Sequence, residues 1–356
     1  MNNNKKPFIL KLGLEAKILF LRNLSLLLKS GMSLTDALIY LKKYQRSPAL
    51  KYILETAIED IQRGQFLATS LSKFNNILGE FLISIIRIGE LTGNLIENLE
   101  RLSEELRKIE RLRRKFISAI IYPIFIILVI LIIIVLVIYF IFPKLLPIFE
   151  NLNVELPKIT KIFISLSRFM LNYGYYVLFL FISLIILIIF LNRFPKIKYF
   201  FDLFLINLPL ISSLIKKYSL TQFSRSLAML LKSGVKIVEA IELSGKNVNN
   251  EVYKKYFIKA SQFVLAGHSF NEFLEKYKKI FPYEFSKMIE VGEKTGNLEQ
   301  NLFYLSNNYE EELDSGIERL VNSLEPIILI IMGIIVGFMA ISIIIPIYEL
   351  TDKIQQ

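Results

Sequence analysis

The sequence predicts an all-α integral membrane protein, in which two homologous cytoplasmic helical-bundle domains of about six helices each are joined to three transmembrane helices. Three observations predict this architecture. The chain is 53% hydrophobic, with a mean hydropathy of +0.48, yet 21% of its residues are charged. Such a composition is typical of long apolar spans that alternate with charged, water-facing domains. The apolar residues gather in three long stretches without charge, and the remainder repeats itself at a fixed offset of 203 residues.

The first domain is assigned to residues 1–117. A helix over residues 14–30 carries leucines and isoleucines on one face, and Gly31 supplies the left-handed residue that ends it. Ser33-x-x-Asp36 resembles a capping box at the start of the next helix. The last helix of the domain begins near Leu95 and has no helix breaker before the first apolar stretch, so domain and membrane helix are expected to be rigidly joined.

The three apolar stretches are long enough to cross a bilayer, which needs about 20 residues. Apolar side chains favour insertion by roughly 0.3 to 0.6 kcal/mol each, and none of the stretches contains an opposing charge. The predicted transmembrane helices are 118–142, 174–192 and 326–348. They leave a periplasmic loop with an amphipathic helix at 143–173 and a periplasmic tail at 349–356.

The flanking charges predict the orientation. Six basic residues precede the first span within residues 107–115, and three follow the second span within residues 193–198. Basic flanks stay on the cytoplasmic side, so both large domains and the N-terminus are predicted to be cytoplasmic and the C-terminus periplasmic.

The second domain, residues 193–325, is predicted to be a copy of the first. Residues 27–31 (LLKSG) recur at 230–234, and residues 89–95 (GELTGNL) recur at 292–298 as GEKTGNL. Lys236 replaces the capping Ser33, so that helix start is expected to be weaker. The apolar run 203–215 is too short to span and is interpreted as an interfacial helix or as core.

The repeated glycine-containing motif supplies the partner-interaction candidates. They are Gly89, Glu90 and Gly93 and their copies Gly292, Glu293 and Gly296. The structural alternative is a helix–turn–helix corner, in which the glycines take positive φ and the following Asn caps the next helix. The two glutamates are not needed for that cap, so we expect them to be the functional members.

Further candidates lie at the starts of the predicted spans and within them. Tyr122-Pro123 and Glu325-Pro326 open spans one and three, where a proline in the first helical turn loses no hydrogen bond. Glu325 is a partner-interaction candidate, because a carboxylate at the membrane boundary is costly unless it is paired. The helix-packing candidates are Gly333, Gly337, Tyr122, Pro123 and Pro326.

No catalytic, cofactor or metal site is predicted. The chain has no cysteine and one histidine, His268, and it contains neither a phosphate-binding loop nor a His-Glu-x-x-His motif. The net charge of +11 lies mainly in residues 1–117, with 20 Lys and Arg against 12 Asp and Glu, and much of it flanks the first span. It is therefore assigned to the membrane surface, with no direct contact to nucleic acid.

The repeated motifs, the Tyr-Pro and Glu-Pro pairs, the Leu-Pro-x-x-Thr element of residues 156–160 and the segment 346–350 together resemble the GspF/PilC family. The resemblance covers residues 20–353, nearly the whole chain. It implies a platform protein of a type IV pilus or type II secretion machine, located in the bacterial inner membrane and without enzymatic activity. The implied partners are a hexameric cytoplasmic assembly ATPase, pilins or pseudopilins, other inner-membrane machine components, membrane lipid and a second copy of the chain.

Two other classes remain open from the residues alone. A small-solute transporter or channel would need polar groups near mid-membrane, and spans one and two offer none. A membrane-embedded peptidase would lose all activity when one acidic residue is replaced.

Overall fold

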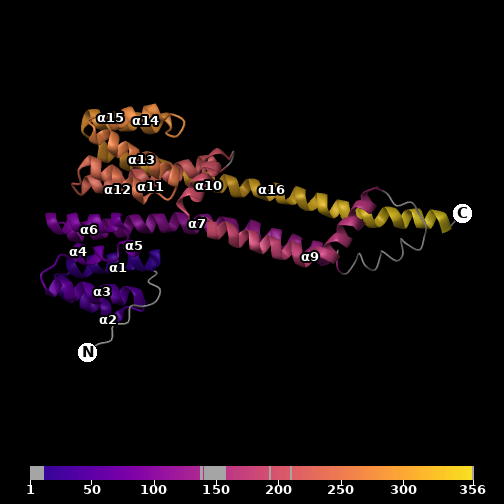
Figure 1. The fold of residues 1–356 in the computed structure, drawn as a ribbon, viewed down its shortest axis with the longest axis horizontal. Coiled ribbons are helices and arrows are strands. Elements are labelled where there is room, and N and C mark those ends of the chain that lie inside the picture. The colour runs from indigo at the N-terminus through magenta and orange to yellow at the C-terminus, as the bar shows by residue number, and fades with distance from the viewer. Residues whose placement is uncertain (1–11, 137–138, 140–157, 192–193, 209–210, 355–356) are drawn as a thin grey trace. The chain divides into compact units, whose positions relative to one another are not determined.

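The computed structural model describes residues 12–136, 139, 158–191, 194–208 and 211–354 (Figure 1). Over these residues the regular elements are helices and no strand occurs. The chain divides into two compact units. Unit 1 comprises Met1–Lys115 and Tyr199–Ser315, and unit 2 comprises Phe116–Lys198 and Gly316–Gln356.

The first repeat begins unit 1 and ends in a helix that continues into unit 2. Its helices are α1 (Leu14–Lys29), α2 (Leu34–Tyr44), α3 (Pro48–Gln62), α4 (Leu67–Ser72), α5 (Asn75–Leu78), α6 (Glu80–Thr92) and α7 (Leu95–Leu136). The second repeat follows the same order from α11 on, with α10 before it and no helix at the position of α5. Its helices are α10 (Pro195–Asn207), α11 (Ser212–Lys232), α12 (Ile237–Asn247), α13 (Glu251–Leu265), α14 (Phe270–Lys276), α15 (Tyr283–Thr295) and α16 (Leu298–Ile354).

The repeat predicted from the sequence is confirmed by the helix bounds. Shifted by the offset of the repeat, the bounds of α2, α3 and α6 coincide with those of α12, α13 and α15. Gly31 and Gly234 both take positive φ, at 90° and 92°, and each ends the first long helix of its repeat as expected. The Ser33 hydroxyl accepts the N–H of Asp36 at 3.2 Å, whereas Lys236 makes no side-chain cap, so the predicted difference between the two helix starts is confirmed.

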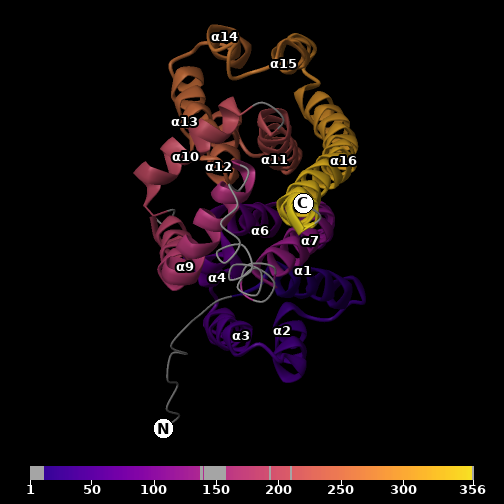
Figure 2. The same ribbon diagram turned by 90° about the vertical axis from the view of Figure 1, so that its right-hand side faces the viewer.

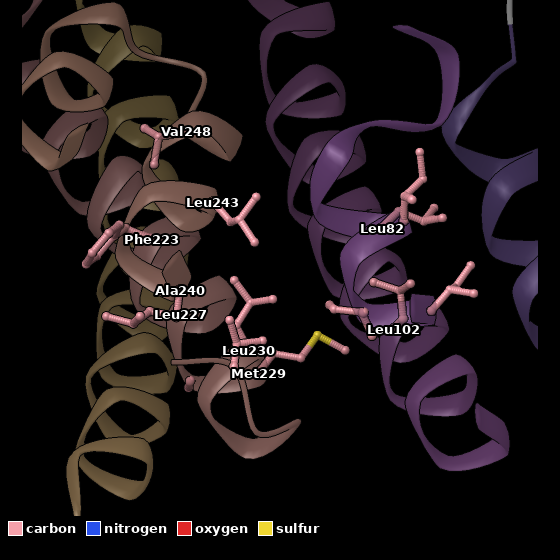
Figure 3. Packing of buried hydrophobic residues seen from close by; sticks show 14 of the residues in the cluster. Leu82, Leu102, Phe223, Leu227, Met229, Leu230, Ala240, Leu243 and Val248 are labelled. Atoms are coloured by element: carbon pink, nitrogen blue, oxygen red, sulfur yellow. The ribbon is translucent and has the colours of Figure 1, made fainter. Parts of the chain in front are cut away.

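The two repeats share one hydrophobic core. Leu82 and Leu102 from the first repeat belong to the same buried cluster as Met229, Leu230 and Leu243 from the second (Figure 3). Helices α6 and α12 are in contact, and α12 and α13 lie side by side in both views of the chain (Figures 1 and 2). Because burial of apolar surface is the main force that stabilises a fold, the repeats support one another.

The core composition differs between the copies. In the second repeat the Phe223 and Phe257 rings stack with centroids 3.4 Å apart, and Phe270 and Phe285 pack around Phe223. At three of these four positions the first repeat has leucine instead: Leu54, Leu67 and Leu82, all buried. At these three positions the same helix arrangement is filled by aliphatic side chains in one copy and by aromatic side chains in the other.

Unit 2 contains α9 (Lys158–Leu191) and the distal parts of α7 and α16. Helix α9 runs without a break through residue 173, where the sequence analysis placed the boundary between the loop with its amphipathic helix and the second span, and that boundary remains a prediction. Gly174 does not interrupt the helix, since an interior glycine costs only about 1 kcal/mol. Its missing Cβ admits Tyr139, whose hydroxyl donates to the Met170 carbonyl at 3.1 Å. The part of the predicted loop at 143–157 lies outside the described residues.

The two long helices confirm one expectation and correct another. Helix α7 continues from Leu95 to Leu136 without interruption, as the absence of a breaker predicted. The prediction that Pro123 and Pro326 stand in the first turn of their helices is wrong, because α7 and α16 begin many turns earlier, at Leu95 and Leu298. Each proline therefore removes an interior backbone donor rather than one that is free at a helix start. Helix α16 extends to Ile354, so the predicted tail is helical over its described residues, and its location remains a prediction.

Within the described residues, no single helix meets the length and hydropathy criteria for a membrane span. Only α10 and α11 meet them as a pair, with a bend of 117° between them. The three spans therefore remain predictions. Helix α11 belongs to the core of unit 1, where residues 219–230 are all buried.

Candidate functional site

The repeated motif forms a tight corner in each half of unit 1. Helix α6 ends at Thr92, Gly93 takes the left-handed conformation with φ of 73°, and α7 begins at Leu95. Gly296 repeats this geometry between α15 and α16 with the same φ. A residue with a Cβ is strained at such an angle, so Gly93 and Gly296 are required by the backbone.

The other two motif glycines do not have the predicted role of adopting positive φ. Gly89 and Gly292 lie inside α6 and α15 and do not take positive φ, so that part of the prediction is wrong. A Cβ at Gly89 would stand 2.9 Å from the Leu95 Cα, and one at Gly292 would stand 2.8 Å from the Leu298 Cα. The glycines therefore allow the backbones of the two helices at each corner to cross in direct contact.

The motif glutamates are capping residues of a neighbouring helix. The Glu90 carboxylate accepts the N–H groups of Leu67 and Ala68 at 2.6 and 2.7 Å, at the start of α4. Glu293 accepts those of Phe270 and Asn271 at 2.8 and 3.1 Å, at the start of α14. The residue before α4 provides no side-chain cap, and the serine before α14 accepts a different N–H, that of Glu272. Each motif carboxylate therefore satisfies donors that the adjacent residue leaves free.

This finding corrects the expectation that the glutamates have no capping role. Glu90 caps a residue that is 23 positions away in sequence, so the local N-cap pattern could not reveal the bond. The negative charge also lies at the positive end of a helix dipole, which adds to the stabilisation. Glu90 is half-buried and Glu293 is exposed. Whether either residue also meets a partner remains a prediction.

One asparagine completes each corner and was missed by the sequence analysis. The Asn98 side chain donates from Nδ2 to the Ile85 carbonyl at 3.3 Å, and Asn301 donates to the Met288 carbonyl at 3.0 Å. These bonds tie the first turn of α7 and α16 back to the preceding helix. The signal was present, because Asn98 and Asn301 are equivalent under the repeat and both follow the repeated motif closely.

A buried ionic cluster joins the two repeats and was also missed. The Arg225 side chain, on α11, is only 4% exposed, and its Nε lies 2.7 Å from Glu105 Oε2 on α7. Its Nη2 pairs with Glu310 on α16 and donates to Asn307 Oδ1 at 3.4 Å. The Glu105 contact is an ion pair without hydrogen-bond geometry, and Nη1 has no partner among the described residues. Comparison of the two repeats does not indicate this role, because Arg22, the equivalent residue of the first repeat, is exposed.

The remaining candidates lie in the parts of α7 and α16 that belong to unit 2. The side chains of Tyr122, Pro123 and Glu325 lie outside what the structure describes. Pro326 is exposed. Within the described part of the chain, no atom beyond the helix backbone lies within 4 Å of a Cβ built at Gly333 or Gly337, so their packing role remains a prediction.

Comparison with known proteins agrees with the repeat. The family model for type II secretion system (T2SS), protein F matches the chain twice, at residues 20–143 and 223–346, with the same offset between the two matches. The type IV pilus assembly protein PilC of Thermus thermophilus is 29% identical over 95% of this chain and 83% of its own length. The PilC protein of Pseudomonas aeruginosa is 26% identical over 94% of this chain and 90% of its own. The type II secretion system protein F of Vibrio cholerae is 26% identical over 98% and 86%, respectively.

Proposed function

Since the chain belongs to the type II secretion system protein F family, we propose that it is an inner-membrane platform protein of a type IV pilus or type II secretion machine. In this proposal it couples a hexameric cytoplasmic ATPase to the insertion of pilins or pseudopilins into a growing fibre. It makes and breaks no covalent bond, and it needs no cofactor. The relatives support the pilus or secretion role, because their names are those of pilus assembly and secretion system proteins.

The observation that carries the proposal is the duplicated helical domain with an apolar continuation after each copy. In both repeats a glycine corner leads into one long helix, α7 or α16, whose first part lies in unit 1 and whose part in unit 2 contains a long uncharged apolar stretch. A helix without a break transmits displacement along its axis. We propose that the ATPase acts on unit 1 and that α7 and α16 carry the movement into the bilayer.

The proposed topology has spans at 118–142, 174–192 and 326–348, with both repeats in the cytoplasm. The chain has no cysteine, so single cysteines can be introduced without removing native ones. Gln62 and Leu265 are suitable positions, because they are exposed and equivalent in the two repeats. Asn151 reports on the predicted periplasmic loop.

With a membrane-impermeant maleimide added to intact cells, Asn151→Cys should be labelled, while Gln62→Cys and Leu265→Cys should be labelled only after the membrane is broken. Labelling of the two repeats from opposite sides would overturn the topology. For the function, deletion of the gene should abolish surface fibres or secretion, and the purified chain should retain the assembly ATPase. Flux of a solute through proteoliposomes, or peptide cleavage by the chain alone, would instead support the transporter or the peptidase.

A further inference from the structure

One face of helix α10 packs against the rest of unit 1. The Asp202 carboxylate accepts the N–H of Glu251, at the start of α13, at 2.8 Å. The Tyr199 ring lies 4.9 Å from the Lys255 ammonium nitrogen, also on α13. Ile206 is buried on the same side, and Figure 2 shows α10 beside α13. These contacts determine which way the helix turns its other face.

The opposite face of α10 carries three exposed phenylalanines. Phe200 is 71% exposed, Phe204 is 63% exposed and Phe201 is 41% exposed. Their spacing of one, three and four residues places them together on one side of a helix. The sequence interpretation placed an interfacial helix or core at 203–215. In the structure Ile206 is buried, whereas Phe204 in the same run is exposed, together with Phe200 and Phe201 just before it.

This surface differs from scattered exposed apolar residues. Single exposed hydrophobic side chains are normal on a protein surface, but three large aromatic rings on one helix face form a patch that water solvates poorly. The first turn of the same helix carries Lys196 and Lys198. Aromatic side chains beside lysines are the composition of helices that lie in the boundary between lipid headgroups and acyl chains.

The connection between α9 and α10 is short. Helix α9 ends at Leu191 and α10 begins at Pro195, so at most about 14 Å of extended chain separates them. If α9 crosses the bilayer, as the proposed function requires, α10 begins within that distance of the end of a span.

We propose that α10 lies on the cytoplasmic surface of the bilayer, with Phe200, Phe201 and Phe204 inserted among the lipid acyl chains and its lysines at anionic headgroups. This inference rests on the proposed membrane topology. It gives unit 1 a second attachment to lipid, which acts through α13 rather than through the long helices. The second repeat is then held at the membrane surface while α7 and α16 move.

The test uses the absence of tryptophan from the chain, which makes any introduced indole the only one in the protein. Phe200→Trp and Phe204→Trp are made singly in the full-length chain. Each is reconstituted in phosphatidylcholine–phosphatidylglycerol vesicles, with ordinary lipids or with lipids brominated at carbons 6 and 7 of an acyl chain. We expect blue-shifted emission and at least a twofold loss of intensity with the brominated lipids.

Two control variants make the result specific. Leu265→Trp is as exposed as Phe200, at 73%, but it stands at the far end of α13, about 20 Å from the end that contacts α10. Its emission should be that of an indole in water and should not change with bromination. Phe179→Trp, in the middle of α9, reports on the proposed span and should be quenched.

The possible outcomes separate the inference from its premise. If Phe179→Trp is quenched and the α10 variants are not, the proposed contact of α10 with lipid is refuted, and the proposed topology stands. Blue-shifted emission without quenching would mean that a protein, such as a second copy of the chain, covers the patch. If Phe179→Trp is itself not quenched, the proposed topology fails and the premise of the inference fails with it.

Discussion

The capping glutamates lead to a quantitative prediction with an internal comparison. Glu90→Gln keeps the shape of the side chain but removes its charge and one of the two acceptors at the start of α4. A hydrogen bond to a charged group contributes roughly 1.5 to 3 kcal/mol, and loss of a helix cap typically costs about 1 kcal/mol. Since glutamine retains one acceptor, we expect a cost of about 1.5 kcal/mol. Glu293→Gln should cost about half as much, because Glu293 is exposed and its bonds are longer.

The assay is native-state hydrogen exchange of the full-length chain, read by mass spectrometry on peptides that cover α4 and α14. A free-energy loss of about 1.4 kcal/mol corresponds to a factor of ten in an equilibrium constant. Glu90→Gln should therefore accelerate exchange of the Leu67 and Ala68 amides about tenfold, and Glu293→Gln should accelerate the equivalent amides about threefold.

A matched control is Glu97→Gln, which removes an exposed ion pair to Arg101 within α7. Such pairs contribute about 0.3 to 0.5 kcal/mol and have no connection to α4, so its amides should not change. The reasoning is refuted if Glu90→Gln leaves the Leu67 and Ala68 amides as protected as before. If fibre assembly is lost in that case, Glu90 is a partner contact rather than a cap.

Three other substitutions test the remaining geometry. Gly89→Ala should destabilise unit 1 by roughly 1 to 3 kcal/mol, because its methyl group would enter the α7 backbone; thermal unfolding in detergent measures this. Arg225→Met leaves two carboxylates without their cation and should cost about 3 kcal/mol or more, whereas Arg22→Met at the equivalent exposed position should cost under about 0.5 kcal/mol by the same measurement. The pKa of Asp60 is lowered below its ordinary 3.8, chiefly by the hydrogen bond from Lys73 and then by one from a serine. The ionised carboxylate therefore stabilises the fold in full above pH 3.8, and this stabilisation is lost as the pH falls through the lower pKa of the folded state. Asp60→Asn should therefore reduce stability at pH 6 and flatten its decline between pH 4 and pH 2.

The repeat and its helices were predictable because they depend on local rules. The positive-φ glycines at 31 and 234, the Ser33 cap and the uninterrupted α7 follow from residue types that restrict the backbone wherever they occur. The same local reasoning misplaced Pro123, since a proline is equally compatible with a helix start and with the interior of a long apolar helix. The sequence alone does not distinguish them.

The contacts that the motif residues make within the fold were not predicted, and their role in partner binding remains a prediction. A carboxylate that caps a helix 23 residues away, as Glu90 does for Leu67, depends on how α4 packs against α6. The role of Gly89 depends likewise on where α7 crosses. The repetition of the motif identified these positions as important, and Asn98 would have been found by extending that comparison slightly further along the chain. Only the packed structure says what each residue contacts.

The two repeats agree where the backbone requires it and differ where they meet. Corner residues such as Gly93 and Gly296 are identical, because the same turn must be made twice. Arg225 is different: its counterpart Arg22 faces water, whereas Arg225 is enclosed by carboxylates from both repeats. A buried charge is costly unless it is paired, so separation of the repeats would take Glu105 away from Arg225 and leave the arginine with Glu310, the carboxylate of its own repeat. The shared core adds apolar surface to the same junction. Duplication has therefore produced one compact unit from two repeats, and both α7 and α16 begin in it.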